Sequence, residues 1–236
     1  LKQEIKQHEI DVLLIAGDVF DSPNPSAESQ RVYYRFLREV TSENPSLQIV
    51  IIAGNHDSAA RLEAPNPLLE DMNIIVRGTV RRNAEGDIDL QHFIVPLYTE
   101  GKVTAYCLAV PYLRQGDYPS AENYSKGVQQ LYEQLFNKVK EKGIPVVAMG
   151  HLQATGSEIS EDDRSERTVI GGLECVSPDA FNEAITYTAL GHLHRSQRVS
   201  HRENVRYSGT PMPMSFAEKN NASGVVMITI DTEGTN

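Results

Sequence analysis

Cysteine is scarce in this sequence. The 236 residues include only two, Cys107 and Cys175, and each lies in or beside apolar sequence. Their spacing suggests no zinc site, and we expect both to be buried, reduced thiols. Reduced thiols are consistent with a cytoplasmic protein.

Long apolar runs are also missing. No stretch is long enough to span a bilayer, and no charged segment followed by an apolar one marks a signal peptide. The Pro-rich, Gly-rich and charged stretches are short, so we expect no long linker or disordered tail. A length of 236 residues fits one large α/β domain, alone or with a small appendage, and we predict one domain over residues 1–236.

Basic residues are outnumbered by acidic ones. The chain has 22 Lys and Arg against 32 Asp and Glu, for a formal net charge of −10. This balance argues against a protein that coats nucleic acid non-specifically. It is compatible with a DNA enzyme, because carboxylates can hold metal ions while a local basic patch meets phosphate.

Two common catalytic devices are absent, since no Ser or Cys occupies a nucleophile elbow and no Gly-rich loop is placed to cradle a nucleotide. The most informative stretch present is Gln48–Asp57. Its β-branched run predicts a buried strand, and Gly54 allows a sharp turn after it. Asn55 and His56 then stand at the carboxyl end of the strand, where open α/β sheets bind ligands. Asn and Asp also favour turns, so this stretch alone fits either a site or a turn.

The same pattern of an apolar run, a glycine and a metal-ligand residue type recurs three times. The runs are Val12–Gly17 before Asp18, Val146–Gly150 before His151, and Tyr187–Gly191 before His192, with His194 two residues later. Strands of one parallel or mixed sheet would bring these ends to one rim. The recurrence favours a metal site, although any one buried His is by itself a common core residue.

Several of these residues allow two interpretations. His192 and His194 reach one site if the strand continues, whereas a β-turn would splay them. Asp18 follows its strand directly and its carboxylate can bridge two cations, while Asp21 fits the cap of a turn as well as a ligand. Arg61 fits a bidentate phosphate contact or a solvated helix start.

The mixed oxygen and nitrogen ligand set suits Mn²⁺, Fe²⁺ or Zn²⁺ better than Ca²⁺ or Mg²⁺. Two such cations about 3.5–4 Å apart can clamp a phosphate ester and convert a bridging water into hydroxide. His56 is placed to protonate the leaving alkoxide. The sequence therefore predicts hydrolysis of a phosphate ester by metal-bound hydroxide.

Away from these motifs, the patterns predict packing elements. Ser26–Val40 is typical of an amphipathic helix with Val32, Phe36 and Val40 on one face, and Ala121–Lys142 contains a second one. Val225–Ile230 is expected to be a last strand. Residues 157–167 are expected to be an exposed, acid-rich loop, with order resuming at 169–172.

Four motifs in this order resemble those of the calcineurin-like metallophosphoesterases: Gly17-Asp18-x-x-Asp21, Gly54-Asn55-His56-Asp57, Gly150-His151 and Gly191-His192-x-His194. The stretch from Tyr207-Ser-Gly-Thr-Pro to Ser-Phe216 is similar, more narrowly, to the family of bacterial SbcD nuclease subunits. The resemblance covers nearly the whole chain. It implies a four-layer α/β/β/α sandwich and a Mn²⁺-dependent DNA exonuclease and endonuclease that acts in DNA repair, recombination and replication. It also implies an SbcC-type ATPase partner and a homodimer.

The resemblance also assigns roles to residues. It implies that Asp18 bridges two metal ions, that Asn55, His151 and His192 bind one of them, and that His194 binds the other. It implies that His56 donates a proton or stabilises the transition state.

Relative to that family, we expect the chain to be truncated at both ends. No Asp-x-His motif precedes Asp18, so the first strand and one metal's ligands are expected to be missing, as is the C-terminal cap. We expect weak occupancy by one cation, reduced activity, and an unpaired sheet edge that favours association. The alternatives are a phosphodiesterase or phosphatase of the same fold for small or protein substrates, and an inactive fragment that serves as a dimerisation piece.

Overall fold

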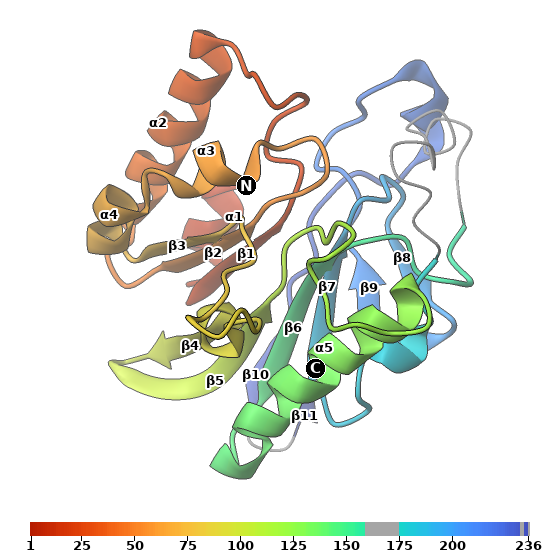
Figure 1. Cartoon of the computed structure of the whole chain (residues 1–236). Coiled ribbons are helices and arrows are strands. Elements are labelled where there is room, and N and C mark those ends of the chain that lie inside the picture. Colours follow the sequence, from red (N-terminus) through yellow and green to blue (C-terminus); the bar gives the residue numbers. More distant parts are fainter. Residues whose placement is uncertain (159–174, 232–233, 236) are drawn as a thin grey trace.

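The computed structural model describes residues 1–158, 175–231 and 234–235, and these residues form four layers (Figure 1). The first sheet is parallel, with the order β1-β2-β3, and its strands are β1 Val12–Ala16, β2 Gln48–Ile52 and β3 Ile74–Arg77. The second sheet has the order β4-β5-β6-β7-β9-β8. Its strands are β4 Ile94–Thr99, β5 Lys102–Ala109, β6 Val146–His151, β7 Tyr187–Gly191, β8 Gln197–Val199 and β9 Arg202–Tyr207.

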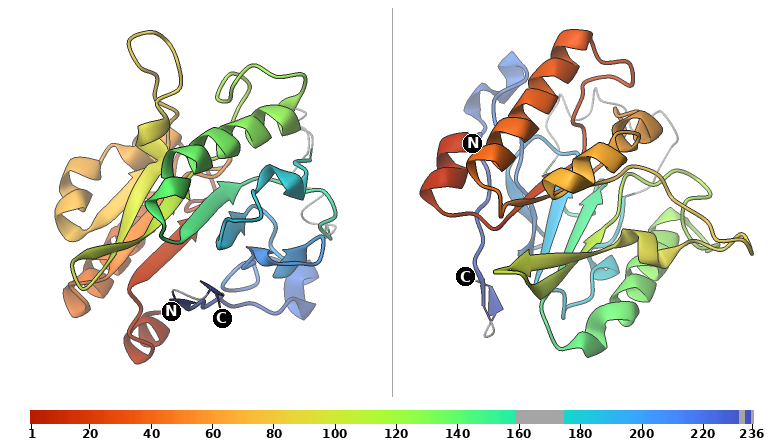
Figure 2. Two further views of the ribbon diagram at one scale, coloured as in Figure 1. Left: turned by 90° about the horizontal axis from the view of Figure 1, so that it is seen from below. Right: turned by 90° about the vertical axis from the view of Figure 1, so that its left-hand side faces the viewer.

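Helices cover the outer face of each sheet. The first sheet carries α1 Lys2–Gln7, α2 Ala27–Glu43, α3 Ala59–Glu63 and α4 Asn66–Leu69, and the second carries α5 Tyr124–Val139. Short 3-10 helices are η1 Glu70–Met72, η2 Leu90–Phe93, η3 Lys140–Lys142, η4 Pro178–Ala180 and η5 Phe216–Asn220. The right-hand view of Figure 2 shows α2 and α5 on opposite sides of the two sheets. The predicted four-layer sandwich is therefore confirmed.

Three apolar clusters hold these layers together. One joins α2 and its neighbours to the first sheet, and one joins α5 to the second. The third lies between the sheets, where Val50 and Ile52 of β2 meet Val95, Cys107 and Met149 of the second sheet. Because the sheets face each other, the four motif-bearing strands do not share one sheet as the recurrence of the pattern suggested. They divide two and two, and their carboxyl ends meet across the interface.

β1 and β2 differ in burial although both are short apolar runs. All five residues of β2 are buried, whereas all five of β1 are only partly buried. β1 lies at the edge of its sheet, with β2 on one side. Among the described residues no strand pairs with its other side, which is consistent with its partial burial.

Two sequence-based predictions about packing are wrong in part. The strand predicted over Val225–Ile230 is limited to β10 Ile230–Asp231, which pairs with β11 Gly234–Thr235. Val225 and Met227 are 51% and 56% exposed, because no described strand lies beside them to accept a longer ladder. Cys107 is buried as expected, but Cys175 is exposed.

α2 forms where the periodicity placed it, and the Ser26 hydroxyl caps it by accepting a hydrogen bond from the Ser29 N–H at 3.0 Å. Its buried face is rotated from the predicted one. Val32 is 55% exposed, while Tyr33 and Leu37 are buried with Val40. The expected order at 169–172 and most of the acid-rich loop lie outside the described residues. No helix in the described part of the chain is long and apolar enough to cross a membrane.

Candidate metal centre

Polar side chains from four strand ends converge where the two sheets meet. Asp18, His151 and His192 each offer one ligand atom, and these atoms lie within 4.8 Å of one another. The Asn55 Oδ1 lies 3.0 Å from His151 Nε2 and 3.1 Å from His192 Nδ1. His151 Nε2 is also 3.1 Å from Asp18 Oδ2. We call these four residues the inner cluster.

The orientation of His151 fits a cation. Its Nδ1 lies 2.7 Å from the carbonyl oxygen of Ala16. A carbonyl only accepts hydrogen bonds, so Nδ1 carries the proton and Nε2 of the neutral ring presents a lone pair. That lone pair faces the oxygens of Asp18 and Asn55. Three electron-rich atoms at about 3 Å need a proton or a cation between them, and a backbone carbonyl that orients the other ring nitrogen is typical of metal-bound His.

Glycine precedes the ligands because neighbouring ligands occupy the space that a Cβ would need. A Cβ on Gly54 would overlap the carboxylate of Asp18. One on Gly191 would overlap the carbonyl of Ala16 and lie 2.9 Å from His151 Nδ1. Gly54 therefore lets the ends of β1 and β2 approach each other within the first sheet, and Gly191 lets the second sheet approach the first.

Two of the four inner residues have a left-handed backbone, with φ 49° at Asp18 and φ 101° at His192. Such angles are costly for residues other than Gly and are found at functional sites. β7 accordingly ends at Gly191. His192 and His194 do not continue an extended strand, so of the two interpretations of this motif the turn is the correct one.

The environment of Asp18 favours its ionised form. Burial by itself would raise the pKa of this carboxyl. When a proton rather than a cation occupies His151 Nε2, the charge and hydrogen bond of His151, with the backbone N–H of His56, outweigh burial and lower the pKa of Asp18 to about 2. Asp18 is therefore ionised over the whole neutral range.

Asp57 has a structural position that the motif did not reveal. Its carboxylate is 2% exposed and accepts hydrogen bonds from the backbone N–H groups of Gly54 at 2.8 Å, Phe20 at 3.0 Å and Val19 at 3.1 Å. Burial raises the pKa of Asp57, and these three donors oppose that rise. Asp57 thus joins the loop that carries Asp18 to the loop that carries Asn55. A buried acid beside backbone turns gives no periodic signal, which is why the pattern did not identify its role.

His56 lies beside the inner cluster. Its backbone N–H donates to Asp18 Oδ1 at 2.9 Å, and its Nδ1 lies 2.9 Å from the carbonyl oxygen of Asp21. Nδ1 therefore donates to this carbonyl, which fixes the orientation of the ring. The role of His56 as a proton donor stays a prediction. Asp21 contributes its backbone here rather than its carboxylate.

Besides His56, two predicted site residues lie outside the inner cluster, namely Arg61 and His194. Arg61 Nη1 donates to the carbonyl of Pro23 at 3.2 Å and contacts the Asn24 side chain, so it braces the loop after β1. Its phosphate contact stays a prediction. His194 Nδ1 lies 2.6 Å from Glu218 Oε1, and its role as a metal ligand also stays a prediction.

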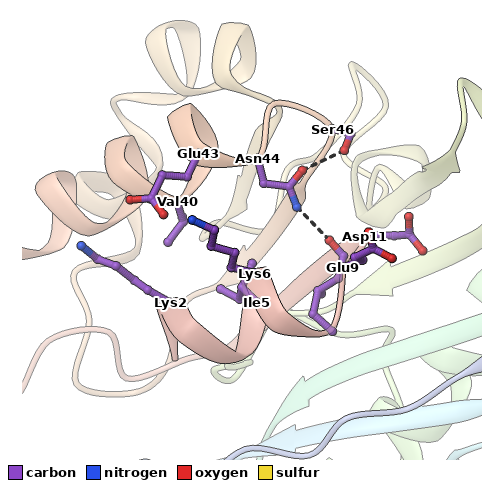
Figure 3. A pocket seen from close by; sticks show the side chains of 10 residues that line it. Lys2, Ile5, Lys6, Glu9, Asp11, Val40, Glu43, Asn44 and Ser46 are labelled. Carbon is purple, nitrogen blue, oxygen red and sulfur yellow. Dashed lines mark hydrogen bonds between the residues drawn. The ribbon is translucent and has the colours of Figure 1, made fainter.

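A cavity of about 300 Å³ lies at the other end of the strands, around α1, the end of α2 and the residues before β1 (Figure 3). Lys2, Lys6, Glu9 and Glu43 give it mixed charge. Asp11 lines it and directly precedes β1, whereas Asp18 follows β1. This cavity is therefore separate from the inner cluster.

Comparison with known proteins agrees with this geometry. The SbcD component of the nuclease SbcCD from Rhodobacter capsulatus is 40% identical over 232 residues, covering 93% of this chain and 56% of that protein. The Escherichia coli K12 protein of the same name is 29% identical, covering 97% of this chain and 57% of its own length. The Bacillus subtilis one is 28% identical, covering 95% and 57%. The chain thus spans little more than half the length of these relatives.

The family model described as calcineurin-like phosphoesterase matches residues 1–196, a range that contains every strand end of the inner cluster. By this match, the chain belongs to the calcineurin-like phosphoesterase family.

Proposed function

We propose that this chain is the catalytic part of a Mn²⁺-dependent DNA nuclease that hydrolyses phosphodiester bonds. The observation that carries the proposal is the inner cluster, where oxygen donors from one sheet meet imidazoles from the other within 4.8 Å. The names of the relatives, which are nuclease subunits, support a nucleic acid as the substrate, and the motif resemblance implies DNA.

In this proposal each residue has a role that follows from its side-chain chemistry. Asp18, Asn55, His151 and His192 would hold the first divalent cation, and Asp18 and His194 the second. A cation held there acts as a Lewis acid on the phosphate and lowers the pKa of the attacking water. Ionised Asp18 supplies one negative charge that would be shared by the two cations. His56, held through its Nδ1 by the Asp21 carbonyl, presents Nε2 to protonate the leaving oxygen.

The proposal extends to partners. The relatives are named as subunits of an SbcCD nuclease, so we propose an SbcC-type ATPase as the partner of the whole protein, with exonuclease and endonuclease action in DNA repair and recombination. We also propose a homodimer. Co-purification with an SbcC-type ATPase, and the mass of the isolated chain in solution, test these two assignments separately.

The decisive experiment compares linear DNA with a chromogenic phosphodiester, both with Mn²⁺, while bound metal is counted by elemental analysis. We expect DNA cleavage by the parent chain and a loss of at least about 100-fold in His56→Asn, with the metal count unchanged. His8→Asn is the matched control, because His8 lies at the exposed end of α1.

Each outcome of this comparison is informative. Rapid turnover of the small diester with intact DNA would replace the nuclease by a small-substrate phosphodiesterase. Unchanged turnover in His56→Asn would remove His56 as the acid. Absence of bound Mn²⁺ and of any turnover would favour an inert dimerisation piece.

A further inference from the structure

Glu218 is a buried acid that the proposed chemistry does not yet use. It lies in η5 and is 1% exposed. Its Oε1 is 2.6 Å from His194 Nδ1, and its Oε2 accepts a hydrogen bond from the backbone N–H of Met214 at 2.8 Å. A buried carboxylate is costly unless it is paired and hydrogen-bonded, and both of its oxygens are satisfied here.

These contacts define the protonation of the His194 ring. Oε2 accepts the Met214 N–H, and a carboxylate can only accept hydrogen bonds, so with Glu218 as the carboxylate the hydrogen between Oε1 and His194 belongs to Nδ1. In the neutral ring, Nε2 is then the nitrogen with the lone pair. A carboxylate that holds the other ring nitrogen in this way is the usual means by which proteins orient a metal-binding or catalytic His.

We propose that Glu218 is the positioning residue for His194, which it holds as the Nδ1-protonated ring so that Nε2 is presented to a cation or to the substrate phosphate. The inference rests on the proposed function in one respect, namely that His194 serves the metal site. It adds an acid 24 residues further along the chain, outside all four ligand motifs.

The surrounding backbone supports a specific arrangement. The N–H of Thr210 donates to the carbonyl of His194 at 3.0 Å. A Cβ on Gly209 would lie 2.6 Å from the same carbonyl, so the loop is in close contact with the His194 backbone. Further along this segment, Met212 and Met214 are each 63% exposed and Phe216 is 96% exposed. Those apolar side chains are exposed, whereas the Glu218 side chain is buried and adds a side-chain contact to these backbone contacts with His194.

The test is the protonation state of the His194 ring in the metal-free full chain, measured by NMR of ¹⁵N-labelled histidine. The His194 signals are identified by their absence in His194→Gln. We expect a proton on Nδ1 and a lone pair on Nε2 in the parent chain. In Glu218→Ala the proton should redistribute towards Nε2, the form that an unconstrained imidazole prefers. Glu203→Ala is the matched control, because Glu203 pairs with Arg198 in an exposed position.

Glu218→Gln covers the case in which Glu218→Ala does not fold. It retains the volume of the side chain, but its single oxygen must serve both Met214 N–H and His194, so we expect an intermediate population. A parent chain protonated on Nε2 alone would overturn the proposal. So would an Nδ1 proton retained in full in the Glu218 variants.

A Mn²⁺ titration separates this inference from the proposed function. We expect Glu218→Ala to weaken the second Mn²⁺ by about 10–100-fold and to leave the first unchanged, because Glu218 contacts His194, the ligand assigned to the second ion. If the parent chain binds one Mn²⁺ only, the assignment of His194 as a ligand fails. The NMR result then still decides whether Glu218 positions the ring.

Discussion

The two sheets contribute different chemistry to the same site. The three-stranded sheet supplies the oxygen donors Asp18 and Asn55, and the six-stranded sheet supplies the imidazoles His151 and His192. Neither sheet carries a mixed ligand set by itself. The contact between His151 Nδ1 and the Ala16 carbonyl, at 2.7 Å, shows how closely the layers approach. The site therefore depends on how the sheets pack, and changes at their interface should affect metal binding and stability together.

The largest effect is expected from Gly191→Ala, which places a methyl group between the sheets. The added Cβ overlaps the Ala16 carbonyl and crowds His151, so backbone must move. We expect a loss of about 3 kcal/mol in the free energy of unfolding and a loss of Mn²⁺ binding, measured by urea unfolding and metal titration. Gly224→Ala is the control, since nothing lies within 4 Å of that position. Equal stability of the two variants would show that the two sheets are not closely packed at Gly191.

Asp57→Asn tests the hydrogen bonds that join the loop after β1 to the loop after β2. Both loops belong to the first sheet, so the second sheet is not changed directly. The amide retains one oxygen, so it cannot accept all three backbone N–H groups of Gly54, Val19 and Phe20. We expect about 2–3 kcal/mol of destabilisation by urea unfolding and weaker Mn²⁺ binding. Asp87→Asn, in an exposed turn, serves as the control. A stable variant with normal metal affinity would contradict the bracing role.

Lowering the pH tests how the region between β3 and β4 contributes to stability, because a buried histidine, His92, lies there. The side chain of His92 is 4% exposed, and burial, followed by the charges of Arg77 and Arg81, lowers its pKa from 6.5 to about 4. The unfolded chain therefore binds the proton first, and stability should fall as the pH drops from 6.5 to about 4. We expect a loss of about 1–3 kcal/mol over this window.

Urea unfolding of the parent chain and of His92→Gln between pH 7 and 4 measures this effect. The variant lacks the titrating group, so its curve should be flatter through the window. Asp18, with a pKa of about 2, contributes at lower pH and does not overlap. Parallel curves would show that His92 does not control acid sensitivity.

The smallest effect is expected from Gln48→Leu, at the amino end of β2. The Gln48 side chain donates to the Pro96 carbonyl at 2.9 Å and accepts from the Tyr98 N–H at 3.2 Å, so it links the two sheets far from the metal cluster. Its loss leaves two backbone groups of β4 without this partner and should cost about 1–2 kcal/mol, with metal binding unchanged. Gln130→Leu on the exposed face of α5 is the control. Reduced Mn²⁺ affinity in Gln48→Leu would mean that metal binding depends on the whole interface between the sheets, and not only on the part next to the inner cluster.

The sequence predicted which strand-end residues lie together more accurately than the packing around them. The inner cluster consists of residues that the recurring motif identified, because the motif combines a β-branched run with a turn-forming glycine and a ligand. The prediction put the wrong face of α2 against the sheet. Val32 and Tyr33 are both apolar enough to be buried, and only the position of the first sheet decides which of them is. The strand predicted over Val225–Ile230 is longer than the observed one, which begins at Ile230. A strand needs a neighbouring strand to pair with, and a local sequence pattern does not show whether one is present.

The sequence by itself determined which segments end in potential ligands and that these ligands mix oxygen with nitrogen. Those features are local, since they depend on residues next to one another in the chain. The tertiary structure alone decided that the four strands divide between two sheets, that Asp57 braces two loops, and that His194 pairs with Glu218 instead of extending β7. These arrangements depend on residues brought together from distant positions, because buried carboxylates and open backbone groups must find their partners in space.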